Sequence, residues 1–276
     1  MITERRYSIT DLTTYIDWTY FFHSWELPAT DKEAQTLRND AMQMLQELQD
    51  NCNVQTIGRV GLFDAGSSGD DIIVTTSDGK HVTIPCLRQQ HTIDGTPNLC
   101  LADFISPMKD DCMSDKVGIF ATTVAYDPDR RYGPDAYLRM MAQTLCDRLA
   151  EAAACKLHEE VRRQIWGYAP DEHLTQEDLL QEHNEGIRPA VGYPSLPDQS
   201  INFLLNPLIG MSEMGITLTE NGAMRPHATV SGLMLAHPQS RYFAVGRIDA
   251  GQLRDYAARR NMPIERLRPF LTNNYR

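Results

Sequence analysis

The sequence predicts an α+β fold in which helices flank a mostly antiparallel, twisted sheet, and three observations support this class. A turn signal, Ser77-Asp78-Gly79-Lys80, separates two runs rich in β-branched residues, which is typical of a hairpin. Farther along, one apolar stripe with helical spacing extends from Met141 to Ile165. Strand-like and helix-like segments are interleaved, but without the regular alternation that builds parallel sheets.

The first expected elements are an aromatic segment and a helix. Residues 15–22 are expected to be extended, with Asp17 as the only charged residue among aromatic side chains. Thr30 and Glu33 then form a capping-box pattern that opens an amphipathic helix through about Gln49. The apolar face of this helix is predicted to contain Ala34, Leu37, Ala41, Met44, Leu45 and Leu48.

Strands are predicted over residues 59–86 and again over residues 117–125. Within the first stretch, residues 71–76 and 81–84 form the two arms of the hairpin. Gly66-Ser67-Ser68-Gly69 lacks the lysine of a phosphate-binding loop and is expected to be a flexible turn.

The longest predicted helix begins near Pro134, a residue suited to a first helical turn, and ends near Trp166. Apolar residues recur in it at every fourth position and must face the core: Met141, Leu145, Leu149, Ala153, Leu157, Val161 and Ile165. Glu151 lies off this stripe. Its neighbours are alanines, which are small enough to let a ligand or another backbone approach closely.

The C-terminal part is predicted to mix short helices and strands. A short acidic helix begins at Thr175, and later helices begin at Asp249 and Pro263. Residues 228–236 and 242–248 are β-like and are expected to contribute to the sheet.

Composition limits the class of function. The 276 residues, 42% of them hydrophobic, can form a sizeable core, and we expect one domain over residues 1–276. A net charge of −11 disfavours binding to nucleic acid or to anionic membranes. No apolar run is long enough to span a membrane, and no signal peptide is recognisable. The six cysteines form no C-x-x-C pair, so reduced thiols in a cytoplasmic protein are expected.

One loop can hold a small anion. Arg188-Pro189-Ala190-Val191-Gly192-Tyr193-Pro194 cannot be helical, because its two prolines and its glycine interrupt the backbone pattern. A fixed loop with open amides beside a guanidinium suits a ligand that carries a carboxylate. By composition alone, the same residues also fit an ordinary surface turn.

Other familiar sites are missing from the sequence. It contains no dinucleotide fingerprint, P-loop or H-E-x-x-H motif, and we expect neither a catalytic acid–base pair nor a metal site. Asp171-Glu172-His173-Leu174-Thr175-Gln176 approximates the D-x-H-x-x-G of cobalamin-binding modules. Gln176 replaces the glycine, so a plain surface loop is expected there.

The R-x-x-x-G-Y-P motif from Arg188 to Pro194 is the most specific of a series of collinear matches. Through them the chain resembles the activation domain of cobalamin-dependent methionine synthase, from about Tyr15 to the C-terminus. The other matching stretches start at Tyr15, Val60, Gly69, Leu87, Leu101, Asp147, Trp166, Ser231, His237 and Tyr242.

This resemblance implies a binding site for S-adenosylmethionine (AdoMet). In the family, AdoMet supplies the methyl group for reductive methylation of oxidised cobalamin, and flavodoxin or an equivalent flavoprotein supplies one electron. The chain shows no homocysteine, folate or cobalamin module. It is therefore expected to act on a separate methionine synthase core chain, which holds the cobalamin. We do not expect it to methylate homocysteine alone.

The resemblance also implies roles for eight residues. Arg188 is expected to bind the ligand carboxylate through its planar fork, and Asp17 to bind the ammonium. The other implied contacts are the backbone of Ala190 and Gly192 with Tyr193 on the adenosine side, Glu151 and Glu182 near the ribose and sulfonium, and Tyr242 in the pocket wall. Without the resemblance, Asp17 could simply cap a turn, and Glu151 could be a solvated helix residue.

Some features leave alternatives open. Gln199 stands where some family members have a histidine, and Pro207 with Gly210 predicts a kinked or short helix after the motif. The chain could instead be a non-catalytic interaction module for another corrinoid protein, with a weakened or lost AdoMet site. Docking of an acidic flavodoxin would need a basic face. The candidates are Arg254, Arg259, Arg260, Arg266 and Arg268, or Arg162 and Arg163, although solvated helix faces explain both groups equally well.

Overall fold

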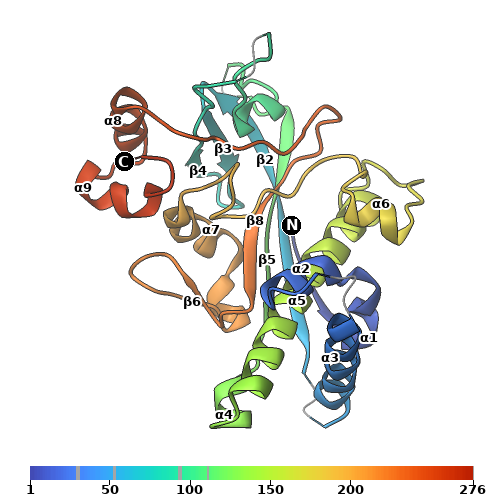
Figure 1. The fold of residues 1–276 in the computed structure, drawn as a ribbon. Helices are drawn as coiled ribbons and strands as arrows, with labels where there is room; N and C mark the ends of the chain where they lie inside the picture. The colour runs from blue at the N-terminus through green and yellow to red at the C-terminus, as the bar shows by residue number, and fades with distance from the viewer. Residues whose placement is uncertain (29–31, 52–53, 93–94, 111, 276) are drawn as a thin grey trace.

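A computed structural model describes residues 1–28, 32–51, 54–92, 95–110 and 112–275. Within them, six strands form one antiparallel sheet in the order β4-β3-β2-β5-β8, with β1 also paired to β2 (Figure 1). The strands are β1 Ile2–Tyr7, β2 Thr56–Ser68, β3 Asp71–Thr75, β4 His81–Pro85, β5 Asp115–Val124 and β8 Thr229–Met234. The predicted α+β class and the hairpin are thus confirmed.

The long β2 strand organises the sheet. Along one edge it pairs with β5, from Thr56 opposite Val124 to Ala65 opposite Asp115. Along its other edge, β1 pairs with residues 56–61 and β3 with residues 64–68. Side chains of β5 are buried from Val117 onward, because both faces of the sheet are covered.

The helices lie on both faces of the sheet. They are α1 Ile9–Leu12, α2 Trp18–Ser24, α3 Lys32–Asp50, α4 Pro128–Tyr132, α5 Ala136–Glu160, α6 Gln176–Leu180, α7 Asn202–Ile209, α8 Ala250–Arg259 and α9 Ile264–Leu267. On one face, α5 with α1 to α3 packs against Phe120 and Val124. On the other face, α7 packs against Ile119 and Ala121. The C-terminal helices α8 and α9 form a smaller apolar cluster around Tyr256.

Helix α5 confirms the predicted stripe. Its members from Met141 to Val161 are fully buried, and the apolar face predicted for α3 is buried as well. The start differs from the prediction, because the side chain of Asp135 caps the helix by accepting from the Leu138 amide, which leaves Pro134 outside. At its end α5 continues into a π-helical turn, Val161–Ile165.

The extended segment expected at residues 15–22 is wrong. Asp17 Oδ1 accepts from the amides of Thr19 and Tyr20, at 2.8 and 3.3 Å, and so begins helix α2. The aromatic side chains then pack at helical spacing, with the rings of Trp18 and Phe21 edge to face 5.3 Å apart.

Two further expectations are wrong, one lies in part outside the described residues, and one is confirmed. Gly66, Ser67 and Ser68 belong to β2, so only the turn that follows them is irregular. Residues 242–248 form no strand, and the sole bond from their backbone to the motif loop joins the Val245 amide to the Pro194 carbonyl. The first residues of the capping box before α3 lie outside the described residues. Helix α7 is short and contains Pro207, as predicted.

Candidate functional site

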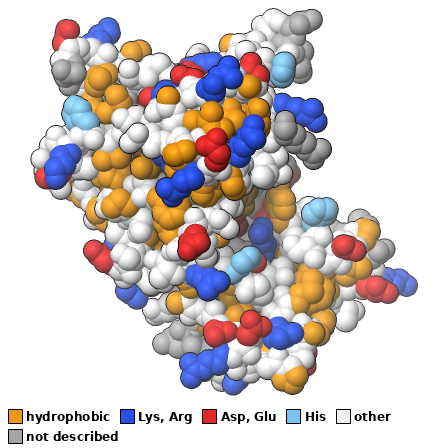
Figure 2. All heavy atoms as spheres, turned by 90° about the vertical axis from the view of Figure 1, so that its left-hand side faces the viewer, with side chains coloured by type: hydrophobic (Ala, Val, Ile, Leu, Met, Phe, Trp, Pro, Cys, Tyr) orange, Lys and Arg blue, Asp and Glu red, His pale blue; other side chains and the backbone are white. Residues whose placement is uncertain are grey.

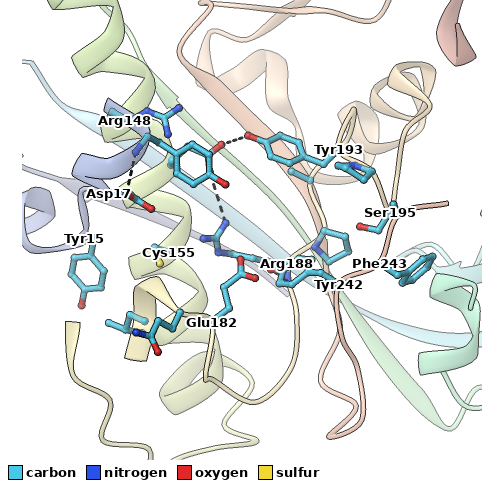
Figure 3. A pocket seen from close by; sticks show the side chains of 18 residues that line it. Tyr15, Asp17, Arg148, Cys155, Glu182, Arg188, Tyr193, Ser195, Tyr242 and Phe243 are labelled. Atoms are coloured by element: carbon cyan, nitrogen blue, oxygen red, sulfur yellow. Dashed lines mark hydrogen bonds and ion pairs between the residues drawn. The ribbon is translucent and has the colours of Figure 1, made fainter. Parts of the chain in front are cut away.

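A cavity of about 660 Å³ opens between helix α5, the start of α2, the end of α6 and the motif loop. Seven of the eight residues predicted for the site line it, and Figure 3 labels five of them around a common space: Asp17, Glu182, Arg188, Tyr193 and Tyr242. The seven are Asp17, Glu151, Glu182, Arg188, Ala190, Tyr193 and Tyr242. Segments from both ends of the chain therefore meet in this pocket.

The motif loop is held as an additional strand-like edge beside β8. Ile187 and Leu235 exchange two backbone hydrogen bonds of 2.9 Å, and the Leu233 amide donates to the Pro189 carbonyl at 3.0 Å. Gly232 lies opposite Ala190 in this pairing. The absence of a side chain at Gly232 lets the two backbones touch, since an ideal Cβ there would lie 2.2 Å from the Pro189 carbonyl oxygen.

Arg188 occupies the centre of the pocket. Its backbone amide donates to Tyr242 Oη at 3.0 Å, and its side chain is only 18% exposed. The nearest carboxylate among the described residues is Glu151, whose Oε2 lies 3.8 Å from Nη1. Burial opposes the charge of the guanidinium, but Cys155, Tyr242 and Glu151 raise the pKa of Arg188 above its ordinary value. The arginine is thus a fixed cation with donor capacity to spare.

Glu151 and Tyr193 form the opposite wall. Tyr193 Oη donates to Glu151 Oε1 at 2.6 Å. Burial and the adjacent Glu151 carboxylate raise the pKa of Tyr193, so its hydroxyl keeps the proton that makes this bond. Burial also raises the pKa of Glu182, although the charge of Arg188 opposes the shift.

Asp17 both caps helix α2 and lines the pocket. Both of its bonds that cap α2 use Oδ1, and no described residue donates to Oδ2. The carboxylate therefore stays available to a cation in the pocket while it holds the helix in place. The capping interpretation and the pocket interpretation of Asp17 are both compatible with this structure.

The backbone predictions at Ala190 and Gly192 have different outcomes. Ala190 lines the pocket. Gly192 does not line the pocket, and its amide donates to the Leu196 carbonyl at 2.8 Å. With φ at +90°, Gly192 makes the tight turn that brings Tyr193 to the pocket. The side chain of Gln199 packs beside this turn.

Sequence reasoning missed several lining residues, chiefly Tyr15, Tyr20, Arg148 and Cys155. Two of these could have been found. Arg148 and Cys155 stand three residues before and four residues after Glu151, and this spacing places all three on one face of α5. Tyr20 gave no such signal, because its position depends on the helix that Asp17 begins.

A buried histidine lies near the pocket. His158 of α5 has its Nε2 3.2 Å from Tyr168 Oη. Burial, together with the charges of Arg162 and Arg188, lowers the pKa of His158 well below its ordinary value of 6.5. The folded protein therefore holds this imidazole neutral where an unfolded chain would bind a proton.

Stability is expected to fall as the pH drops below about 6.5, because the unfolded state then binds a proton that the folded state excludes. The contribution of His158 reaches about 1.4 kcal/mol per pH unit. Urea unfolding of wild type and His158→Gln between pH 5 and 8 measures it, and the variant should have the shallower slope. His81→Gln, at an exposed position of β4, should keep the wild-type slope. Equal slopes in all three proteins would contradict the assignment.

The C-terminal arginines do not form the continuous basic face considered for docking. Arg259 forms ion pairs with Asp71 and Asp255, and Arg260 pairs with the buried Asp198. Only three of the group are exposed: Arg254, Arg266 and Arg268. Figure 2 shows basic side chains on this face scattered among acidic ones.

The second basic candidate also fails. Arg162 is 1% exposed and forms an ion pair of 2.7 Å with Glu172, while Arg163 pairs with Glu159 at 3.1 Å. Arg162 is therefore buried at the end of α5 and not free for a partner, which leaves Arg163 as a single, partly exposed arginine of this group.

The described residues contain neither a metal-binding cluster nor a membrane-spanning helix. No cluster of three or more His, Cys, Asp or Glu side chains is placed to hold a metal ion. None of the helices in the described ranges is long and apolar enough to cross a membrane.

The chain is similar to known proteins in sequence and in fold. Residues 8–261 match the family model described as "Vitamin B12 dependent methionine synthase, activation domain". A solved structure, "Crystal Structure of the MetH Reactivation Domain bound to AdoHcy", is similar with a TM-score of 0.92 and 39% sequence identity. The alignment covers 100% of this chain and 90% of that one.

Proposed function

The chain belongs to the family of vitamin B12-dependent methionine synthase activation domains, and we propose that its pocket binds AdoMet for the reductive methylation of a cobalamin on a separate methionine synthase chain. One observation carries the proposal. A buried, fixed Arg188 and the free Oδ2 of Asp17 face the same cavity, as a carboxylate and an ammonium on one carbon atom require.

The charge of the pocket supports a cationic ligand. Two arginines and three carboxylates line it, which amounts to −1 when all are ionised. AdoMet carries a carboxylate, an ammonium and a sulfonium, so its net charge of about +1 complements the wall. The likeness to a reactivation domain bound to AdoHcy, the product of methyl transfer from AdoMet, points to the same ligand class.

The proposed reaction needs positioning more than acid–base chemistry. One electron from flavodoxin or an equivalent flavoprotein reduces cob(II)alamin to cob(I)alamin. The cobalt electron pair then attacks the methyl carbon, the S–CH3 bond breaks, and AdoHcy leaves. The pocket would hold the sulfonium methyl toward the acceptor, which is an orientation effect. No proton has to move, so no residue is assigned as catalytic.

Residues 1–276 are proposed to act as one activation domain. Asp17 near one end and Tyr242 near the other line the same cavity, so both segments are needed to complete it. For the electron donor, the exposed arginines Arg254, Arg266 and Arg268 remain the docking candidates.

Arg188→Ala is expected to weaken AdoMet binding by about a hundredfold, because it removes a charge-assisted pair to the ligand carboxylate. Isothermal titration calorimetry measures the effect. Arg254→Ala, an exposed change outside the pocket, should leave the affinity unchanged, and thermal unfolding should show that both variants are folded. Absence of saturable heat from wild type at millimolar AdoMet would contradict the proposal and favour an interaction module.

A further inference from the structure

Arg148 is the one arginine of the main pocket that carries no assigned role. It lies on α5, three residues before Glu151, and it also lines a second cavity of about 200 Å³. Glu151 and Tyr193 line both cavities too, so their hydrogen bond forms part of the shared wall. Arg148 therefore stands at the boundary between the two spaces.

The guanidinium of Arg148 has unused donors. Its Nε is buried and has no hydrogen-bond partner among the described residues, and no described carboxylate forms an ion pair with it. The guanidinium lies over the ring of Tyr20, whose centroid is 5.9 Å from Cζ. Tyr20 is 62% exposed, which places this pair at the solvent side of the pocket.

AdoMet gives Arg148 little to bind. The proposed carboxylate partner is Arg188, and the remaining charges of the ligand are positive and would be repelled by a second guanidinium. A cation at this rim instead suits an uncharged or anionic oxygen acceptor that arrives from outside the pocket. The methyl acceptor is the molecule that must approach this side.

We propose that Arg148 docks the methyl acceptor by donating hydrogen bonds to carboxamide oxygens at the edge of a corrin ring. A corrin carries primary amide side chains around its periphery, and a guanidinium fork matches their carbonyl oxygens. The stacked Tyr20 ring limits the side-chain freedom of Arg148, so less entropy is lost when the contact forms. This inference rests on the proposed function for the identity of the acceptor.

Arg148→Met tests the proposal, because it keeps the aliphatic stem and removes every donor. Arg139→Met, on the same helix, serves as the control, since Arg139 pairs loosely with the exposed Asp129 and lines neither cavity. Two quantities are measured for each variant. One is the AdoMet affinity by calorimetry. The other is the affinity, without AdoMet, for a methionine synthase fragment that lacks its own activation domain, with and without bound cobalamin.

The expected result is specific to the cobalamin-loaded fragment. Arg148→Met should bind it at least about tenfold more weakly than wild type, a change that corresponds to loss of one good hydrogen-bonded contact. The affinity for the cobalamin-free fragment should match wild type. The AdoMet affinity should not fall, because the variant removes only a repulsion of the ligand's positive charges. Arg139→Met should be unchanged throughout.

Other outcomes would overturn the inference in distinguishable ways. A parallel loss of AdoMet affinity would place Arg148 in the donor site and leave the proposed function intact. An equal loss toward the cobalamin-free fragment would identify an amide of the partner protein as the acceptor. If wild type did not associate with the cobalamin-loaded fragment, the proposed docking contact of Arg148 would be contradicted. If wild type bound no AdoMet but the docking effect persisted, the proposed function alone would fail.

Discussion

Gly232→Ala is expected to weaken AdoMet binding by about a hundredfold or more and to lower the free energy of unfolding by about 3 kcal/mol. An ideal Cβ at this position lies 2.2 Å from the Pro189 oxygen and 2.8 Å from Ala190 Cα, and both of these are backbone atoms. To reach van der Waals separation the loop must retreat by about 1 Å. That movement breaks the bond from the Leu233 amide to Pro189 and shifts Arg188.

Calorimetry with AdoMet and thermal unfolding measure the two effects. Gly58→Ala is a matched control, because it makes the same change on β2 of the same sheet. Its Cβ would meet only side chains, at 3.3 Å or more, and these can adjust. If both variants bound AdoMet and melted alike, the motif loop would not be fixed by its contact with β8.

Local patterns in the sequence predicted the helices that carry one apolar face. The stripe on α5 and the face of α3 follow from spacing alone, since a helix buries every third or fourth residue whatever lies opposite. The prediction failed at residues 15–22, where aromatic composition suggested a strand. The capping side chain of Asp17 decides the outcome there.

Features that depend on remote partners could not be read from the sequence. Residues 242–248 have a strand-like composition, but a strand also needs a neighbour that supplies a ladder of hydrogen bonds. The motif loop supplies only a single backbone hydrogen bond to them, from the Val245 amide to the Pro194 carbonyl. The loop at Arg188 suggested a carboxylate site by its own composition, whereas the other pocket residues were predicted from the resemblance alone. Helical spacing from Glu151 adds Arg148 and Cys155, whereas Tyr20 required the structure.

Glu172 shows how a loop residue can matter to the core. Its hexapeptide was expected to be a plain surface loop, yet the Glu172 carboxylate reaches the buried Arg162. The Nε of Arg162 lies 3.0 and 2.8 Å from the two oxygens, and Nη2 lies 2.7 Å from Oε2. No local signal announces such a pair, because the arginine stands ten residues earlier, within the π turn.

Glu172→Gln is therefore expected to destabilise the protein by about 3–5 kcal/mol, because it leaves the guanidinium of Arg162 buried without a counter-charge. The glutamine keeps the shape of the side chain, so the loss reports the charge and not a cavity. Urea unfolding at pH 7 measures the change. Glu177→Gln is the control, since Glu177 is an exposed residue of α6 and should alter stability by less than about 0.5 kcal/mol.

The double variant Arg162→Met/Glu172→Met tests which of two causes explains the lost stability. One is the burial of an unpaired guanidinium, and the other is loss of an ion pair that fixes the loop. Replacement of both partners by apolar side chains removes the need to bury an ion, so most of the stability lost in Glu172→Gln should return. Recovery in the double variant with loss in the single variant would establish the cost of an unpaired Arg162. A double variant as unstable as Glu172→Gln would show instead that the ion pair itself fixes the loop after α5.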